Sequence, residues 1–91
     1  MRLSDEVINE IRSRADIAQV VGHYLPLEKS GKDFKTRCPF HDDHDPSMRV
    51  SIDKQLYKCF VCGNGGNVYT FVQRYDHVGF VEAVKKVADI I

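Results

Sequence analysis

This sequence of 91 residues has few cysteines, no long apolar run and no excess of charge of one sign. No apolar run approaches the ~20 residues that cross a bilayer, so the sequence predicts no transmembrane helix and no membrane partner. Residues 1–5 lead directly into charged sequence without the apolar centre of a secretory signal. We therefore expect a soluble cytoplasmic protein.

Neither sign of charge is in excess, because 13 basic and 13 acidic residues give a formal net charge of zero at pH 7. A neutral total neither favours nor excludes a nucleic-acid partner until the positions of the charges are considered. The acids in the middle of the chain are mostly gathered in one short loop with Asp42, Asp43 and Asp45. The basic residues of the same stretch are Lys29, Lys32, Lys35, Arg37, Arg49, Lys54 and Lys58.

All three cysteines lie in one pattern, a Cys-x-x-His turn at 38–41 and a Cys-x-x-Cys turn at 59–62. Two such turns present four nitrogen or sulfur donors, which is the ligand number of a structural Zn²⁺. An odd number of cysteines fits poorly with a disulfide framework and well with thiolates kept reduced. The sequence predicts one structural Zn²⁺ with the ligands Cys38, His41, Cys59 and Cys62.

Two alternatives to this metal site stay open. His44 lies three residues beyond His41 and could replace it as the ligand, although the tighter Cys-x-x-His spacing favours His41. The same donors could also hold another soft metal or an iron-sulfur cluster, which would give the chain a redox role.

The pattern of apolar residues predicts an α+β fold, with a small antiparallel zinc-ribbon sheet flanked by N- and C-terminal helices. A chain of this length forms one domain and buries only about 60% of its unfolded surface, so a metal crosslink supplements a modest core. We expect a single zinc-binding domain over residues 1–91, with a helical arm at 1–30, the zinc ribbon at 31–66 and a helical cap at 67–91.

Helix signals lie at both ends of the chain. Ser4 is typical of the residue that caps a helix, and Asp16 is predicted to start a second, short helix that ends at Gly22. Asn67 is the expected cap of a third helix, and a fourth begins near Phe80. The apolar residues expected to share one face of the first helix are Val7, Ile8 and Ile11.

Strand signals occupy the middle of the chain, at 33–37, 48–52 and 55–60, after an extended stretch at 24–27 and a turn at 29–32. A tight turn rather than a phosphate-binding loop is expected at 63–66, because no Gly-Lys-Ser/Thr sequence follows a strand there. Since side chains alternate across a strand, Phe34 and Tyr57 fall on the cysteine side and are expected in the core. The opposite face is expected to hold Lys35, Arg37, Arg49, Ser51, Lys54, Leu56 and Lys58.

These motifs together resemble the N-terminal zinc-binding domain of bacterial DNA primases of the DnaG type, over almost the whole chain. Three positions differ from the family pattern without removing a ligand: Met48 replaces an aromatic residue, Lys58 a histidine and Val61 a glycine. The residues that carry the resemblance are Asp16-Ile17, Val20-Val21-Gly22, Cys38-Pro39-Phe40-His41, Pro46-Ser47, Lys54, Cys59-Phe60-Val61-Cys62-Gly63, Gly65-Gly66-Asn67 and Phe80-Val81-Glu82-Ala83-Val84.

The resemblance implies a module that engages single-stranded template DNA and helps a separate polymerase domain begin an RNA primer. It implies DNA contacts by Lys32, Lys54, Leu56 and Lys58, which agrees with the basic face expected from strand alternation. Lys35 and Arg37 lie on the same expected face, and we include them as candidate DNA-binding residues. Lysines that neutralise phosphates would make binding salt-sensitive.

The resemblance also implies that this segment of a nucleotidyltransferase holds no catalytic residue. Mg²⁺ would be bound only in the separate polymerase domain, which is the partner in cis or in trans, and the replicative helicase would be reached through other parts of the parent protein. The acidic loop of Asp42, Asp43 and Asp45 is a poor substitute, because catalytic metal ions need ligands held rigidly by several elements.

Two other functions are weighed against DNA binding. A zinc-ribbon module for protein interaction would use the apolar helices after Asn67 as a docking surface and would bind no DNA. The basic face could also serve only to keep the sheet soluble. A fragment of a longer primase and a free-standing chain that acts in trans both fit the sequence.

Overall fold

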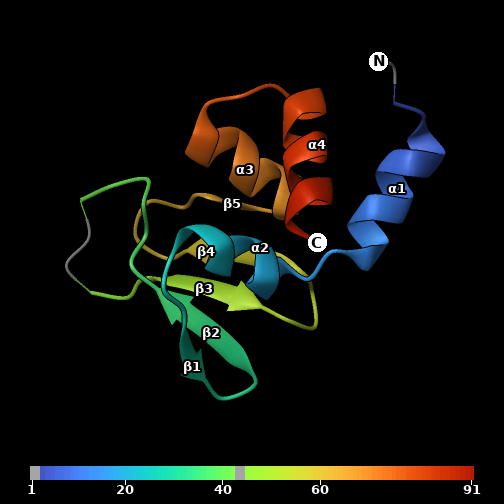
Figure 1. The fold of residues 1–91 in the computed structure, drawn as a ribbon. Coiled ribbons are helices and arrows are strands. Elements are labelled where there is room, and N and C mark those ends of the chain that lie inside the picture. The colour runs from blue at the N-terminus through green and yellow to red at the C-terminus, as the bar shows by residue number, and fades with distance from the viewer. Residues whose placement is uncertain (1–2, 43–44) are drawn as a thin grey trace.

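The computed structural model of the chain describes residues 3–42 and 45–91, and it has the expected α+β fold (Figure 1). All neighbouring strands of its single five-stranded sheet are antiparallel, in the order β1-β2-β3-β4-β5. The elements are α1 (Asp5–Arg14), α2 (Ile17–Tyr24), β1 (Glu28–Ser30), β2 (Asp33–Thr36), β3 (Met48–Ser51), β4 (Leu56–Cys59), β5 (Gly65–Gly66), α3 (Val68–Asp76) and α4 (Phe80–Ile90).

The predicted starts of the N-terminal helices are confirmed by their caps. The Ser4 hydroxyl accepts a hydrogen bond from the Val7 amide at 3.3 Å, and the Asp16 carboxylate accepts one from Ala18 at 3.0 Å. On α1, Ile8 and Ile11 pack against the core, but Val7 is exposed, so the expected three-residue apolar face is narrower than predicted.

The predicted end of the second helix at Gly22 is wrong, because α2 continues to Tyr24. A glycine inside a helix costs only about 1 kcal/mol relative to alanine, which the buried residues of α2 offset. The helix ends where Pro26 follows Leu25, since a proline disfavours helical backbone in the preceding residue. Leu25 is accordingly extended, with φ −132° and ψ 146°.

The three predicted strands are confirmed as β2, β3 and β4, each shorter by one or two residues than expected. The two edge strands were not predicted. β1 lies in a stretch expected to contain a turn at 29–32, and only Gly31 and Lys32 form that turn. β5 lies within the expected turn at 63–66, and it pairs with β4 through backbone alone, since both of its residues are glycines.

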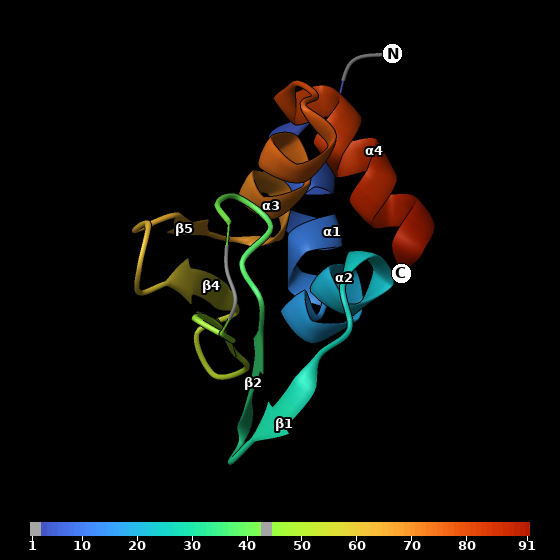
Figure 2. The ribbon, with the colours of Figure 1, turned by 90° about the vertical axis from the view of Figure 1, so that its left-hand side faces the viewer.

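The predicted separation of the sheet into an apolar and a basic face is confirmed for β3 and β4, whereas in β2 both Phe34, which packs against the core, and Lys35 are half-buried. Met48, Val50, Tyr57 and Cys59 alternate along β3 and β4 and are buried beneath the helices, which lie to one side of the strands in Figure 2. Phe71 of α3 lies at the centre of this core, with ring contacts to Tyr24, Phe40, Tyr57 and Tyr75.

The C-terminal helices α3 and α4 cover the inner, apolar face of the sheet. The Asn67 side chain accepts hydrogen bonds from the amides of Tyr69 and Thr70, which confirms it as the cap of α3. α4 packs against α3 and begins at Phe80, as expected. Within the part of the chain that the structure describes, none of the helices has the length and apolar content needed to span a membrane.

Candidate metal centre and nucleic-acid interface

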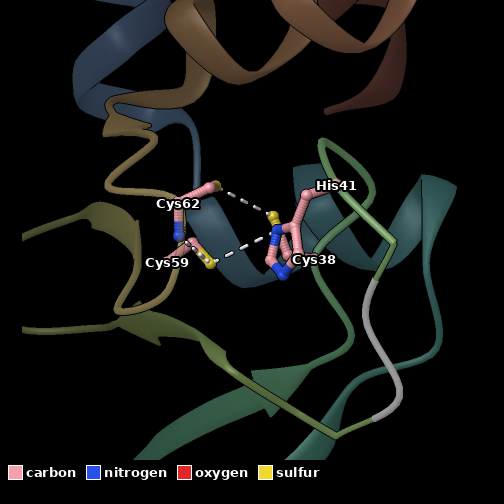
Figure 3. A group of neighbouring side chains, drawn as sticks. All are labelled: Cys38, His41, Cys59 and Cys62. Atoms are coloured by element: carbon pink, nitrogen blue, oxygen red, sulfur yellow. Dashed lines mark hydrogen bonds between the residues drawn. The ribbon is translucent and has the colours of Figure 1, made fainter.

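The four predicted metal ligands come together at one end of the sheet (Figure 3). Cys38 follows β2 and His41 lies three residues later, while Cys59 is the last residue of β4 and Cys62 follows in the next turn. Their ligand atoms all lie within 4.8 Å of one another. Strands β2 and β4 are not neighbours, so this cluster joins two strands across β3.

The distances within the cluster fit a tetrahedral zinc site. The sulfurs of Cys38 and Cys62 are 3.7 Å apart, and the Cys59 sulfur is 3.8 Å from His41 Nδ1. Ligands bound at about 2.3 Å in tetrahedral geometry lie about 3.8 Å from one another. Three thiols and an imidazole at this spacing are consistent with one zinc ion.

Hydrogen bonds around Cys59 hold the second turn in the shape that presents its sulfur. The Cys62 amide donates to the Cys59 sulfur at 3.4 Å, and the Ser47 hydroxyl lies 3.5 Å from it. The Gly63 amide donates to the Cys59 carbonyl at 3.0 Å, and Gly63 has the positive φ of 78° that this tight turn requires.

The thiols differ in how readily they lose a proton. Burial raises the pKa of the Cys38 thiol above its ordinary value. Burial acts in the same direction on Cys59, but the amides of Cys62 and Val61 and the hydroxyl of Ser47 favour its thiolate and lower its pKa. A cation is therefore met by one thiolate that these hydrogen bonds already stabilise, and it must displace the proton of Cys38.

Arg74 of α3 anchors the chain segment that leaves the second turn. Its guanidinium donates to the Asn64 side chain, to the Gly65 carbonyl at 3.1 Å and to the Tyr57 hydroxyl at 3.4 Å. The Cys59 amide donates to the Asn64 carbonyl at 2.8 Å. The metal cluster, β5 and α3 are thus joined by one hydrogen-bond network.

The outer face of the sheet carries three cations in one row across neighbouring strands. The strand register places Lys35 of β2 opposite Arg49 of β3, and Arg49 opposite Lys58 of β4. One end of the row is Gly65, which pairs with Lys58 and adds no side chain, and the other end is Glu28 of β1, which lies opposite Lys35. Arg49 has a cation on both sides, and like charges directly opposite one another destabilise a sheet, so these two pairs carry a cost in the absence of an anion.

A hollow of about 760 Å³ opens on this face beside the metal cluster. It is lined by four of the six predicted DNA-binding residues, Lys32, Lys54, Leu56 and Lys58. The other two, Lys35 and Arg37, line a neighbouring hollow near β1 instead, although Lys35 belongs to the cation row.

Lys32 already has an acidic neighbour, because its ammonium forms an ion pair with Asp53, and both residues line the hollow. The hydrogen bond and the charge of Asp53 raise the pKa of Lys32, which keeps the ammonium protonated. Both side chains are largely exposed, and exposed ion pairs contribute little free energy. A phosphate can therefore compete with Asp53 for Lys32.

Two further residues of this hollow, Arg49 and Phe60, were not predicted to bind DNA. Arg49 was placed on the basic face but not among the DNA-binding residues. Phe60 lines the hollow with 67% of its surface exposed, although the large aromatic residues Tyr57 and Tyr69 are buried in the core. The sequence did offer a signal for the exposure of Phe60. Phe60 lies between the two ligands of a Cys-x-x-Cys turn, and the middle residues of such a turn point away from the metal.

The acidic loop does not contribute to the cluster among the residues that the structure describes. Asp42 and Asp45 are exposed, and neither belongs to the group of possible metal ligands. Asp43 and His44 lie outside the described residues, so the structure does not test His44 as the alternative ligand.

Comparison with known proteins identifies the family. The family model for the CHC2 zinc finger, the zinc ribbon of DnaG, matches residues 3–91. The chain belongs to the CHC2 zinc-binding domains of DnaG-type DNA primases. Val61 occupies the position at which this family often has glycine, and it does so without a positive φ, so a side chain is tolerated there.

Similar proteins include the DNA primases of two other organisms. The chain is 47% identical over 89 residues to DNA primase of Listeria monocytogenes, and 47% identical over 89 residues to DNA primase of Staphylococcus aureus. Each match covers 98% of this chain but only 14% and 15% of the respective primase. This CHC2 domain is thus homologous to a small part of these enzymes.

A solved structure shares the fold of the CHC2 domain. It is the crystal structure of Aquifex aeolicus primase with its zinc-binding and RNA polymerase domains, which matches with a TM-score of 0.88 and 44% sequence identity. The match covers 96% of this chain and 21% of that structure.

We expect substitution of a ligand to release the metal and unfold the ribbon. Cys59→Ser and His41→Gln should each lower the zinc content to well below one ion per chain, because three donors bind Zn²⁺ more weakly than four. His23→Gln is the matched control, since His23 is exposed on α2 and outside the cluster. Metal analysis together with circular dichroism checks this, and full zinc content with a native spectrum in Cys59→Ser would contradict the ligand set.

Proposed function

We propose that this CHC2 domain is the template-recognising module of a DNA primase. It binds one structural Zn²⁺ through Cys38, His41, Cys59 and Cys62, and it binds single-stranded DNA on the outer face of the sheet. Primer synthesis is then carried out by a polymerase domain, with its own Mg²⁺, to which this module presents the template.

The row of Lys35, Arg49 and Lys58 is the observation that carries the proposal. Lys35 has an acidic residue, Glu28, opposite it on β1, but Arg49 lies between two cations, in a position where a sheet that needed only solubility could carry an acid. Phosphates of a bound strand would neutralise the row and release condensed counterions. The basic face is thus better explained by binding of a polyanion than by solubility alone.

The hollow beside the row suits bases as well as phosphates. Leu56 and Phe60 line it with 42% and 67% of their surfaces exposed, while Lys32, Lys54 and Lys58 supply charge around them. Bases stack on aromatic and apolar side chains without strong dependence on sequence. This mixture of exposed apolar and cationic groups favours a single strand, whose bases are free to stack, over a duplex.

The polymerase domain is the partner that the comparisons favour. The Aquifex aeolicus structure combines zinc-binding and RNA polymerase domains in one primase, and the present chain covers about a fifth of it. The described residues bring no carboxylates into the metal cluster, which suits a structural rather than a catalytic ion. We infer that the domain acts with its polymerase domain in cis or in trans.

A protein-interaction module without DNA binding is less well supported. The apolar faces of α3 and α4 are already occupied by the chain's own core, where Phe71, Val72, Val84 and Val87 are buried. Among the described residues after Asn67, the exposed large apolar side chains are Phe80 and Val81 at the start of α4 and Ile91 just beyond its end. The helices after Asn67 therefore offer less docking surface than the sequence suggested.

The charge of the outer face can be tested by DNA binding. We expect Lys54→Ala with Lys58→Ala to weaken binding of a single-stranded oligonucleotide and to reduce the slope of log K against log salt by about 0.7 for each lost phosphate contact. Arg14→Ala with Lys85→Ala is the control of equal charge change, because both residues form exposed helical ion pairs away from the hollow. Equal affinities and slopes for the two double variants would argue against a DNA-binding face.

Stacking by Phe60 is tested separately from charge. Phe60→Ala should weaken single-strand binding by about 1–3 kcal/mol without changing the salt slope, as expected for one lost base stack. Val61→Ala is the matched control, since Val61 is equally exposed, at 69%, but does not line the hollow. Fluorescence anisotropy at several salt concentrations measures both quantities, and a normal affinity in Phe60→Ala would remove Phe60 from the interface.

Primer synthesis tests the whole proposal. A related primase polymerase domain that lacks its zinc module should synthesise primers on a short single-stranded template faster when the zinc-loaded chain is added in trans. The stimulation should be lost with the metal-free chain and with Lys54→Ala/Lys58→Ala. Equal stimulation by the native chain and by that double variant, at saturating concentration, would contradict template recognition by this face.

A further inference from the structure

A second hollow, of about 470 Å³, adjoins the one beside the metal cluster. Lys54 and Leu56 line both hollows, so Leu56 forms the boundary between them and Lys54 faces each. The far wall of the second hollow is formed by Arg12 and Ser13 near the end of α1. A basic residue thus lies on each side of this hollow.

The wall formed by α1 is held in place relative to the sheet. The Ile17 amide donates a hydrogen bond at 2.8 Å to Gln55 Oε1, and Gln55 Nε2 donates at 2.7 Å to the Ile52 carbonyl. Gln55 therefore joins the α1–α2 junction to the β3–β4 turn, which lie beside each other in Figure 1. The Tyr69 hydroxyl also holds α1, because it donates to the Ile8 carbonyl at 2.6 Å.

Arg12 is available for an anion, unlike its neighbour on the helix. Arg12 forms no ion pair with any residue that the structure describes, whereas Arg14 pairs with Glu10 at 2.7 Å. The carboxylate in the second hollow belongs to Asp16, and it is engaged as the cap of α2 through the Ala18 amide. A guanidinium suits a phosphate, because its fork of donors can bind two oxygens at once.

We propose that the single-stranded nucleic acid extends over Leu56 into this second hollow, where Arg12 binds a phosphate of a nucleotide beyond those beside the metal cluster. This inference rests on the proposed function and lengthens its site. The strand then runs from Phe60, past Lys54 at the boundary, to the end of α1. The N-terminal helix, in which Ile8 and Ile11 are only partly buried, thereby gains a binding role.

The length of the bound strand provides the test. Oligothymidylates from about three to about twelve nucleotides are titrated against the zinc-loaded chain, a range that brackets typical single-strand sites. For the native chain, affinity should rise over the short lengths and rise again once the strand reaches the second hollow. Arg12→Gln should lose this second rise, with several-fold weaker binding of long strands and a salt slope lower by about 0.7, while short strands bind as to the native chain.

Two further variants make the outcome specific. Arg14→Gln makes the same change of charge two residues away and should bind all lengths like the native chain. Ser13→Glu places a negative charge in the second hollow and should weaken only the long strands. Zinc content and circular dichroism verify that each variant is folded.

The outcomes separate this inference from the proposed function. If the native chain binds short strands and Arg12→Gln binds long strands equally well, the extension is wrong and the site beside the metal cluster stands. If Arg12→Gln weakens all lengths equally, Arg12 belongs to no second site. If the native chain binds no length of strand, the proposed function itself fails and takes the extension with it.

Discussion

The contact on which the rest of the structure depends is the meeting of two metal-binding turns across β3. Cys38 lies beyond β2 and Cys59 ends β4, so an ion bound between them connects strands that do not pair with each other. The Cys59 turn is in turn joined through Asn64 and Arg74 to β5 and α3. Binding free energies of about 10–16 kcal/mol for structural zinc are as large as the whole stability of a typical small domain, about 5–15 kcal/mol. Folding of the ribbon and binding of the metal are therefore expected to be one event.

The metal centre and the outer face of the sheet carry charges of opposite sign. Zn²⁺ with three thiolates has a formal charge of −1, so the metal centre itself repels phosphate. The cations lie on the outer face of the sheet, where Lys35, Arg49 and Lys58 oppose one another across three strands. The metal would thus favour the anionic ligand that we propose only by fixing the strands that carry these side chains.

Strand alternation and helix caps were readable from the sequence because each depends on neighbouring residues. The faces of β3 and β4 follow from a period of two, and the caps at Ser4, Asp16 and Asn67 follow from their side-chain oxygens. The edge strands were not readable, since β5 consists of two glycines that only the backbone of β4 recruits. The spacing of the cysteines predicted which residues cluster, but the exposure of Phe60 and the division of the outer face into hollows depend on strand register and on tertiary packing, which local sequence does not encode.

Both edges of the sheet are short, with three residues in β1 and two in β5. A side chain at position 65 would place its Cβ 2.8 Å from the Tyr57 carbonyl, so β5 must keep a glycine where it pairs with β4. Long unpaired edges invite strand addition, both by partners that extend a sheet and by other copies during aggregation. Because both edge strands are so short, the sheet of the CHC2 domain can offer a partner little more than its broad face. A ligand of the sheet must therefore lie across the strands rather than add a further strand at an edge.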